Sequence, residues 1–297
     1  MRSTFFIFLV FISCGDIDKT LPPSKGKNSE VIFVVNDELW LHSVDSLVGI
    51  TFGDAIEGIN QRESLFSTIQ INHNEFNSIL KTHRNIVIIS EGASPSSQRD
   101  KWADGQFVAQ LNWQDNAKKL LKELIELRTV FIKKELNSIR MSFEKSSQND
   151  IEKRVLKNFK INLIVPKEYQ KIINDSTLFW ASYNPVNSDE IKNVFVFSFF
   201  PKNTNLQEQI LLKTDSVFQI HLIGEKSGSY VRIEPEYPPH YTEEVYRGLW
   251  KLENGFMGGP FIIKTYFVKR KIIVSVGMVF APQSLKRKYI KEFEAIL

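Results

Sequence analysis

Residues 234–244, which read EPEYPPHYTEE, hold the densest group of side chains that could do chemistry in this 297-residue chain. The group consists of Glu234, Glu236, His240, Glu243 and Glu244. Carboxylate oxygens and an imidazole nitrogen could together bind a divalent metal. The alternative, which we favour, is a solvated loop stiffened by its prolines. We therefore expect no metal and no other cofactor.

A second candidate site, for contact with a ligand or partner, follows shortly after. It comprises Arg247, Trp250, Met257, Gly258, Gly259 and Pro260. Glycines permit positive φ and leave backbone amides open to a ligand. The alternative is a bulged hairpin corner at which Pro260 begins a strand. Arg247 and Trp250 are three residues apart, so on a strand they would face opposite sides, which counts against a pocket formed by both.

Common catalytic motifs are missing from the sequence. It contains no GxSxG elbow, HExxH, CxxC or Walker loop. Its histidines share no spacing typical of metal ligands; they are His42, His73, His83, His221 and His240. We therefore assign no catalytic residue.

Cys14 is the only cysteine, and it directly follows an apolar stretch. Phe5–Ile12 is too short to cross a bilayer, which takes roughly 20 apolar residues, but it fits the core of a signal peptide. Phe11-Ile12-Ser13-Cys14 resembles the bacterial lipobox. That resemblance implies cleavage after Ser13 and acylation of both the Cys14 thiol and the new amino terminus. The alternative, a buried structural cysteine, is weaker because the apolar run stops there.

The next segment, GDIDKTLPPSKGKNSE, covers residues 15–30 and has no apolar periodicity. Such a composition predicts a flexible tether, with a reach of about 50 Å at full extension. We therefore predict a signal peptide (1–13), a lipidated amino terminus with tether (14–30) and a folded domain (31–297). The domain would be held at a membrane and face the periplasm or the cell surface.

The charge of the chain argues against nucleic acid as a partner. Removal of residues 1–13 leaves 37 of the 38 basic residues beside 34 acidic ones, a net charge of +3. The basic clusters are short, whereas nucleic-acid binding needs a concentrated basic face. The expected partners are a membrane, through the lipid anchor, and an envelope protein or ligand that the sequence does not name.

Apolar patterning predicts the elements of the first half. Strands are expected at 31–35, 69–71, 86–89 and 107–111, helical structure within 37–60, a short helix at 75–81 and a polar loop at 90–100. A long helix is expected at 115–146, with an apolar stripe of Leu120, Leu124, Leu127, Phe131, Ile132, Leu136, Ile139 and Phe143. The stripe predicts packing across a sheet, with a coiled-coil seam as the alternative.

The second half has apolar runs at 161–165 and 178–181, a central strand at 194–200 and a helix at 205–221. Strands at 246–252, 261–268 and 272–281, with a turn at Asn254-Gly255, predict an antiparallel meander. Ser284 is expected to cap a final helix, whose buried face would be Leu285, Tyr289, Phe293 and Ile296. The fold class is α+β, a largely antiparallel mixed sheet or sheets with one long helix and a C-terminal helix packed on the sheet. The order of elements also raises the hypothesis of two similar halves, 31–158 and 159–297.

Several motifs in the second half form a recognisable set. They are YRGLW (246–250), MGGPF (257–261), GMVFAP (277–282), a basic pair and a terminal EAIL. This set resembles the uncharacterised bacterial lipoprotein family termed domain of unknown function 4837. The resemblance implies an envelope lipoprotein of a Gram-negative bacterium. It implies no activity.

Two functional hypotheses follow. The first is a non-enzymatic binding or assembly module anchored at a membrane. The second is a lipid-anchored, hydrolase-like enzyme with a site near residues 234–260. A cleft that holds Glu236, His240 and Arg247 together would favour the enzyme, whereas a smooth surface there with an exposed aromatic patch elsewhere would favour binding.

Overall fold

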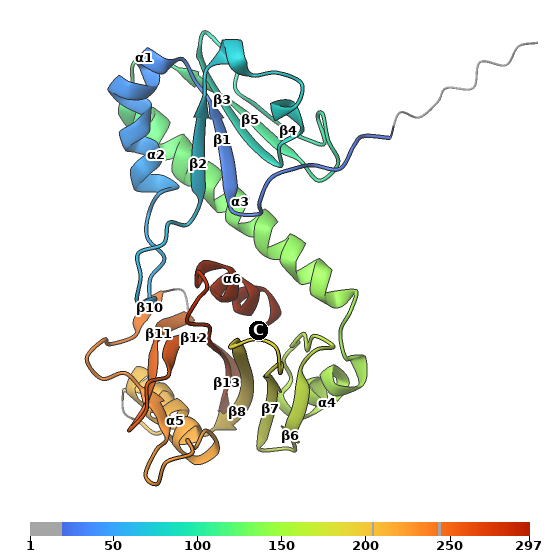
Figure 1. The fold of residues 1–297 in the computed structure, drawn as a ribbon, viewed down its shortest axis with the longest axis vertical. Coiled ribbons are helices and arrows are strands. Elements are labelled where there is room, and N and C mark those ends of the chain that lie inside the picture. The colour runs from blue at the N-terminus through green and yellow to red at the C-terminus, as the bar shows by residue number, and fades with distance from the viewer. Residues whose placement is uncertain (1–19, 204, 243–244) are drawn as a thin grey trace, which may run out of the picture.

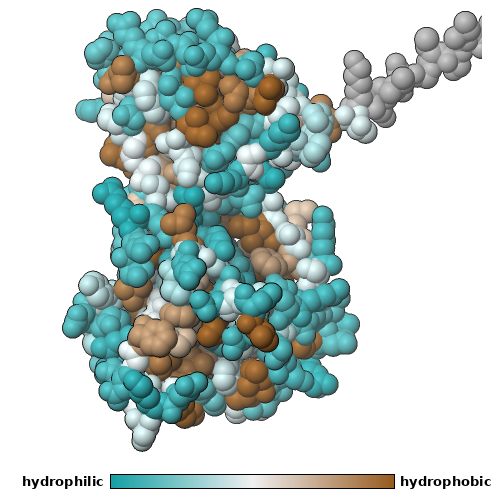
Figure 2. All heavy atoms as spheres, viewed as in Figure 1, coloured by the Kyte–Doolittle hydropathy of each residue, from teal (hydrophilic) through white to brown (hydrophobic). Residues whose placement is uncertain are grey.

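The computed structural model describes residues 20–203, 205–242 and 245–297. Two lobes meet at a narrow waist (Figure 1, Figure 2). The upper lobe holds the first sheet and the lower lobe the second. Helix α3 (Ala117–Glu144) starts against the upper sheet and crosses the waist to the lower lobe (Figure 1). Helices combined with mostly antiparallel sheet confirm the predicted α+β class.

The upper sheet has five strands, in the order β2 (Ser67–Ile71), β1 (Glu30–Val34), β3 (Asn85–Glu91), β5 (Phe107–Trp113) and β4 (Ser96–Arg99). The first four run parallel, and β4 pairs antiparallel with β5 at the edge. The buried runs of β1 and β3 are apolar on both faces, which is typical of parallel strands covered on both sides. All four strands predicted for this half are present.

Helices cover one face of the upper sheet. They are α1 (Asp37–Leu39), a π-helical turn (Trp40–Val44), α2 (Asp45–Thr51) and the first half of α3. Leu120, Leu124, Leu127 and Phe131 of α3 are buried in this core, and the Phe131 ring meets Phe107 of β5 edge to face, with ring centroids 5.4 Å apart. The first part of the apolar stripe therefore packs across a sheet, as predicted, rather than in a coiled coil, whereas Phe143 packs against the core of the lower lobe.

Two of the segments predicted for the first half need correction, and one helix was not predicted. Instead of a helix at 75–81, the chain forms two 3₁₀ turns, His73–Glu75 and Leu80–Thr82. The predicted loop at 90–100 contains β4, which carries no apolar signal because all four of its residues are exposed. Helix α4 (Asn149–Phe159) was not predicted, although Ile151, Val155 and Phe159 recur every four residues on its buried side.

The lower sheet has eight strands and is antiparallel throughout. Its order is β10 (His240–Thr242), β11 (Val245–Leu252), β12 (Gly258–Val268), β13 (Lys271–Phe280), β8 (Ile191–Phe199), β7 (Leu178–Tyr183) and β6 (Gln170–Asn174), with β9 (Val231–Ile233) also on β11. The predicted meander is β11–β12–β13, and the predicted central strand is β8. The two sheets differ in strand direction and order, so the topology gives no support to the hypothesis of similar halves.

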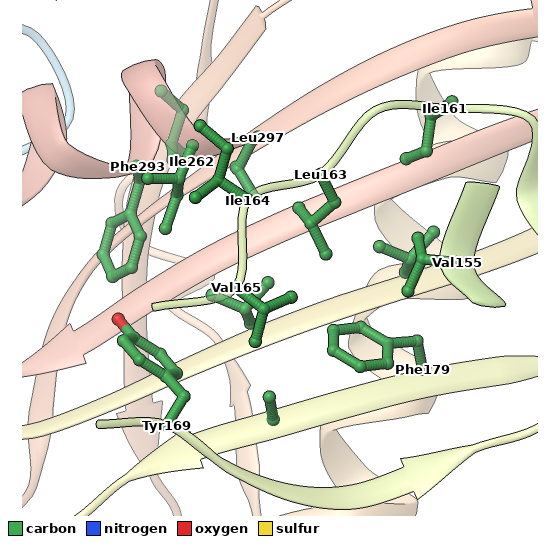
Figure 3. Close-up of a cluster of buried hydrophobic side chains, with 14 of the residues drawn as sticks. Val155, Ile161, Leu163, Ile164, Val165, Tyr169, Phe179, Ile262, Phe293 and Leu297 are labelled. Atoms are coloured by element: carbon green, nitrogen blue, oxygen red, sulfur yellow. The ribbon is translucent and has the colours of Figure 1, made fainter. Parts of the chain in front are cut away.

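Two cores lie on the two faces of the lower sheet. Helices α4 and α6 (Arg287–Ile296) cover one face, where Phe179, Ile262, Phe293 and Leu297 pack with the buried segment Ile161–Val165 (Figure 3). Helix α5 (Leu206–His221) covers the other face. The C-terminal helix thus packs on the sheet, as predicted.

The start of α6 is stabilised by the upper lobe. The Glu63 carboxylate accepts from the backbone N–H of Lys286 at 2.6 Å and of Arg287 at 2.9 Å. No side chain within α6's own segment caps it, so the predicted cap by Ser284 is wrong. Leu285, predicted on the buried face, is exposed. A carboxylate 223 residues away in sequence replaces the local hydroxyl.

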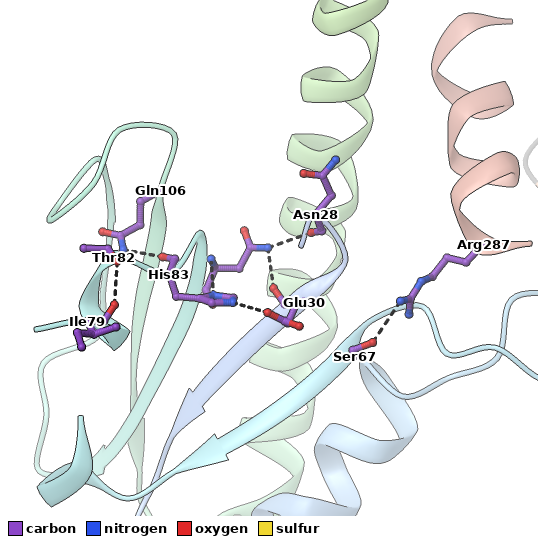
Figure 4. Close-up of polar contacts among 9 residues, drawn as sticks. Asn28, Glu30, Ser67, Ile79, Thr82, His83, Gln106 and Arg287 are labelled. Carbon is purple, nitrogen blue, oxygen red and sulfur yellow. Dashed lines mark hydrogen bonds and ion pairs between the residues drawn. The ribbon is translucent and has the colours of Figure 1, made fainter. Parts of the chain in front are cut away.

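The described part of the predicted tether is paired with the upper lobe. Ser24 donates its N–H to Asp104 O at 3.0 Å, and Lys25 donates to Thr82 O at 2.9 Å. The adjacent network includes a 2.8 Å contact between the His83 imidazole and the Glu30 carboxylate (Figure 4). The chain is therefore fixed to the lobe before β1 begins.

Candidate functional site

An apolar pocket of about 280 Å³ opens at one end of the lower sheet. Strands β7, β8, β11 and β13 form its floor, and the segment that follows α5 lies over it. Its largest apolar lining residues are Trp180, Leu222, Trp250, Met257, Met278 and Phe280. Two of the six residues predicted for ligand or partner contact, Trp250 and Met257, therefore line this pocket.

Strand alternation and two glycines position Trp250. Its side chain points into the core on the α5 face, and its indole Nε1 donates to Val279 O at 3.3 Å. Gly259 is paired with Trp250 in the strand register, and a Cβ on Gly259 would lie 2.0 Å from Val279 O. Gly258 is similarly close to the backbone, with a Cβ position 3.0 Å from Trp250 O. The glycines therefore allow β12 to approach its neighbours closely.

The predicted bulged corner at Pro260 takes a different form. Strand β12 begins at Gly258, two residues before Pro260, and Pro260 is paired with Leu249. Neither Gly258 nor Gly259 has a positive φ. The MGGP motif thus combines a residue that lines the pocket, Met257, with residues that allow close strand packing.

The pocket offers little polar chemistry. Trp180 Nε1 donates to Asn193 Oδ1 at 2.9 Å, and Ser182 Oγ donates to Lys192 O at 3.4 Å, so these groups are satisfied by the protein. The lining includes no acidic, basic, histidine or cysteine side chain. At its edge, Ile223 is 71% exposed, and nearby Phe256, which packs against the Phe280 ring, is 90% exposed. Such a site can bind apolar groups but has no side chain suited to proton transfer.

Arg247 lies on the opposite face from Trp250, as the strand period predicted. Its guanidinium forms an ion pair with Glu294 of α6 and donates to Thr242 Oγ1 at 3.2 Å. Gly58, at the tip of an upper-lobe loop, packs against the Arg247 backbone with a positive φ of 77°. Arg247 therefore joins the two lobes and does not line the apolar pocket.

The stretch at 234–244 forms no metal centre in its described part. Glu234 pairs with Lys251 at 3.6 Å, and the exposed His240 lies opposite Arg247 in the strand register. Across the described ranges, no three histidine, cysteine or acidic side chains are arranged to hold a metal ion. Glu243 and Glu244 lie outside the described residues, and so does Cys14.

A second hollow, of about 630 Å³, lies at the carboxyl ends of β1 and β3, and no sequence motif indicated it. Its lining includes Asn36, His42, His73 and Ser90. In open parallel sheets, ligands bind at this edge where connections leave to opposite faces. The hollow could have been found only by predicting that the upper strands run parallel.

Comparison with known proteins gives two matches to family models. The lower lobe, an antiparallel sheet with helices on both faces, falls within a match to the family model Domain of unknown function (DUF4837) over residues 148–297. The chain belongs to this family, as its motifs predicted. Residues 24–149 match a second model, Domain of unknown function (DUF8532), so the two matches meet between α3 and α4.

Other comparisons add no functional information. No curated protein matches the chain. A crystal structure from Bacteroides thetaiotaomicron VPI-5482 is similar at 10% identity and a TM-score of 0.20, over 44% of this chain and 41% of that one. A likeness of that size carries no argument. Among the described residues, none of the helices is both long and apolar enough to cross a membrane.

Proposed function

We propose that this chain is an envelope lipoprotein, anchored through acylated Cys14 and facing the periplasm or cell surface, that acts as a non-enzymatic binding or assembly module. The short apolar run and the lipobox-like residues before Cys14 support the anchor. The observation that carries the binding role is the apolar pocket, which is lined by no titratable side chain. The enzyme hypothesis gains no support, because Arg247 is engaged by Glu294.

The occupant we propose for the pocket is an apolar side chain of a partner protein. The volume of about 280 Å³ is small for a free ligand but suits one large side chain. Exposed Ile223 and Phe256 extend the apolar area beyond the pocket. Large exposed apolar groups around a concave site mark protein interaction surfaces, where one buried anchor residue provides much of the affinity.

Pairing of residues 24–25 with the upper lobe shortens the free part of the tether. Residues 15–21 would span at most about 23 Å when extended. An acylated chain would therefore hold the upper lobe close to the membrane. Helix α5 lies on the side of the lower lobe away from the waist (Figure 1), and the residues that directly follow it line the apolar pocket. That placement would present the pocket to other envelope components.

The anchor is tested by the intact mass of the protein extracted from membranes, beside a Cys14→Ala variant. We expect a chain that begins at Cys14 and carries acyl mass, and neither feature in the variant. An unlipidated chain that retains residues 1–13 would contradict the proposed location.

The pocket is tested by photocrosslinking in living cells, with a photoreactive residue in place of Phe256. The matched control is the same residue at Ile79, an exposed apolar position on the upper lobe. We expect a discrete protein adduct at position 256 that is weaker at 79 and lost with Met257→Glu, which places a charge in the pocket. Equal adducts at both positions, or an adduct insensitive to Met257→Glu, would refute a pocket-specific partner.

A further inference from the structure

A polar cleft of about 570 Å³ lies at the waist between the lobes. The segment at 27–29 and Arg84 border it from the upper lobe, α3 forms its wall, and the first turns of α6 border it from the lower lobe. Figure 4 shows Asn28 beside α3 and Arg287 reaching from α6 to Ser67. The cleft therefore exists only when both lobes are in place.

Four cations in the cleft lack an acidic partner. Within the described ranges, Lys27, Arg84, Arg287 and Lys288 form no ion pair. The two acids that line the cleft are already neutralised: Glu135 is paired with Lys291, and Glu292 with Lys192 at 2.8 Å. The cleft thus has an excess of positive charge, with Lys27 and Lys288 exposed and Arg84 and Arg287 half-buried, and this charge attracts an anion.

The Arg84 side chain supplies a second, independent observation. Its Nε is buried and has no hydrogen-bond partner. Within the described ranges the Arg84 guanidinium forms no hydrogen bond or ion pair, so it keeps its capacity to bind an anion in the cleft. Ser138 and Ser142 of α3 add hydroxyl groups to the same wall. Guanidinium, ammonium and hydroxyl groups together match the oxygens of a phosphate group.

We propose that this waist cleft is a binding site for a phosphate-bearing ligand, with Arg84 and Lys288 as its principal contacts from the two lobes. The phosphate belongs either to a soluble phosphate ester or to a lipid headgroup. Because the contacts come from both lobes, the bound ligand would also stabilise their relative position.

Calorimetric titration of the full-length, membrane-extracted protein in detergent tests the site. Inorganic pyrophosphate is the probe for a soluble ligand, and a short-chain phosphatidylglycerol is the probe for a headgroup. We expect saturable binding of at least one probe, and the tighter one identifies the source. Arg84→Gln combined with Lys288→Gln should weaken binding by at least about tenfold, while Lys288→Arg should retain it.

The matched control is Lys118→Gln combined with Lys122→Gln, which likewise removes two positive charges, here from the exposed side of the first turns of α3. Circular dichroism of each variant establishes that it is folded. Lack of binding by both probes would overturn the proposal. So would an equal loss of affinity in the variant with both Lys118 and Lys122 replaced, because that result would mean a general effect of net charge.

Discussion

The ammonium group of Lys291 on α6 bonds to the carboxylate of Glu135 on α3, and the two side chains are only 5% and 4% exposed. Ser29 Oγ donates to the same carboxylate at 2.5 Å. Lys291 also donates to Leu65 O at 3.1 Å and lies over the Phe66 ring, 4.4 Å from its centroid. One buried ion pair thus holds α6 against three segments of the upper lobe. Burial lowers the pKa of Lys291, and the Glu135 charge opposes that effect.

Removing one partner of this pair should strongly destabilise the protein. Lys291→Met leaves the Glu135 carboxylate buried without its cation, and such changes typically cost about 3–5 kcal/mol of unfolding free energy. The double variant Glu135→Leu/Lys291→Met should lose less, because no buried charge is left unpaired. Urea unfolding followed by circular dichroism measures both effects.

An exposed pair on the same helix provides the control. Lys122 and Glu126 of α3 are 80% and 67% exposed and lie 4.0 Å apart, so Glu126→Ala should change the unfolding free energy by less than about 1 kcal/mol. If Lys291→Met unfolds at the same urea concentration as Glu126→Ala, the buried pair does not couple the lobes.

Glu63 should matter to α6 more than the hydroxyl next to the helix does. Its carboxylate accepts from two otherwise unpaired N–H groups at the helix start. Glu63→Ala should therefore reduce stability by about 0.5–2 kcal/mol, the usual value of an N-cap. If the Ser284 hydroxyl were the cap, Ser284→Ala would destabilise the protein. We expect this variant to have almost the same stability as the wild type. A larger loss from Ser284→Ala in thermal unfolding would reverse this assignment.

The capping of α6 illustrates what the sequence could and could not predict. Local patterns were sufficient for the strands that are apolar on both faces, such as β8, and for the opposite orientations of Arg247 and Trp250, because both depend on the strand period. A cap by Glu63 depends on chain folding over 223 residues, so no local pattern carries it. Ser96–Arg99 pairs as a strand through its backbone alone and leaves no apolar signal.

The sites divide in the same way. Trp250 and Met257, two of the candidates for ligand or partner contact, line one pocket because they are close in sequence on neighbouring parts of the meander. The waist cleft draws Arg84 from the upper lobe and Lys288 from α6, and nothing in either local sequence indicates that they meet. Its positive charge is also hidden in the near-neutral composition of the whole chain.

Gly277 is expected to tolerate no side chain. A Cβ at this position would lie 2.4 Å from the Phe293 ring, which is buried where α6 packs on β13. Gly277→Ala should cost about 1–3 kcal/mol, as for other overpacked cores. Gly49, inside α2, has open space around its Cβ position, and Gly49→Ala should stabilise by up to about 1 kcal/mol. Thermal unfolding measures both effects, and an equal decrease in the unfolding midpoint of the two variants would contradict this packing argument.

Lys134 of α3 should titrate far below an ordinary lysine. Its pKa is lowered from 10.5 to about 8, chiefly by burial and then by the positive charge of Arg84, while Asp100 raises it and Arg99 lowers it by smaller amounts. Its Nζ donates to Asn85 Oδ1 at 3.1 Å and to Arg84 O at 3.3 Å. NMR of lysine Cε resonances against pH measures the pKa directly, and Arg84→Gln should raise it.

The same shift predicts the pH dependence of stability. The pKa of Lys134 is lower in the folded protein than in the unfolded chain. Between about pH 8 and 10.5, the unfolded chain therefore binds a proton that the folded protein has lost. Unfolding free energy therefore gains a contribution that rises with pH across this window. Lys134→Met removes that contribution whatever its effect on absolute stability. The difference between wild-type and variant unfolding free energies should increase from pH 8 to 10, and a constant difference would show that Lys134 has an ordinary pKa.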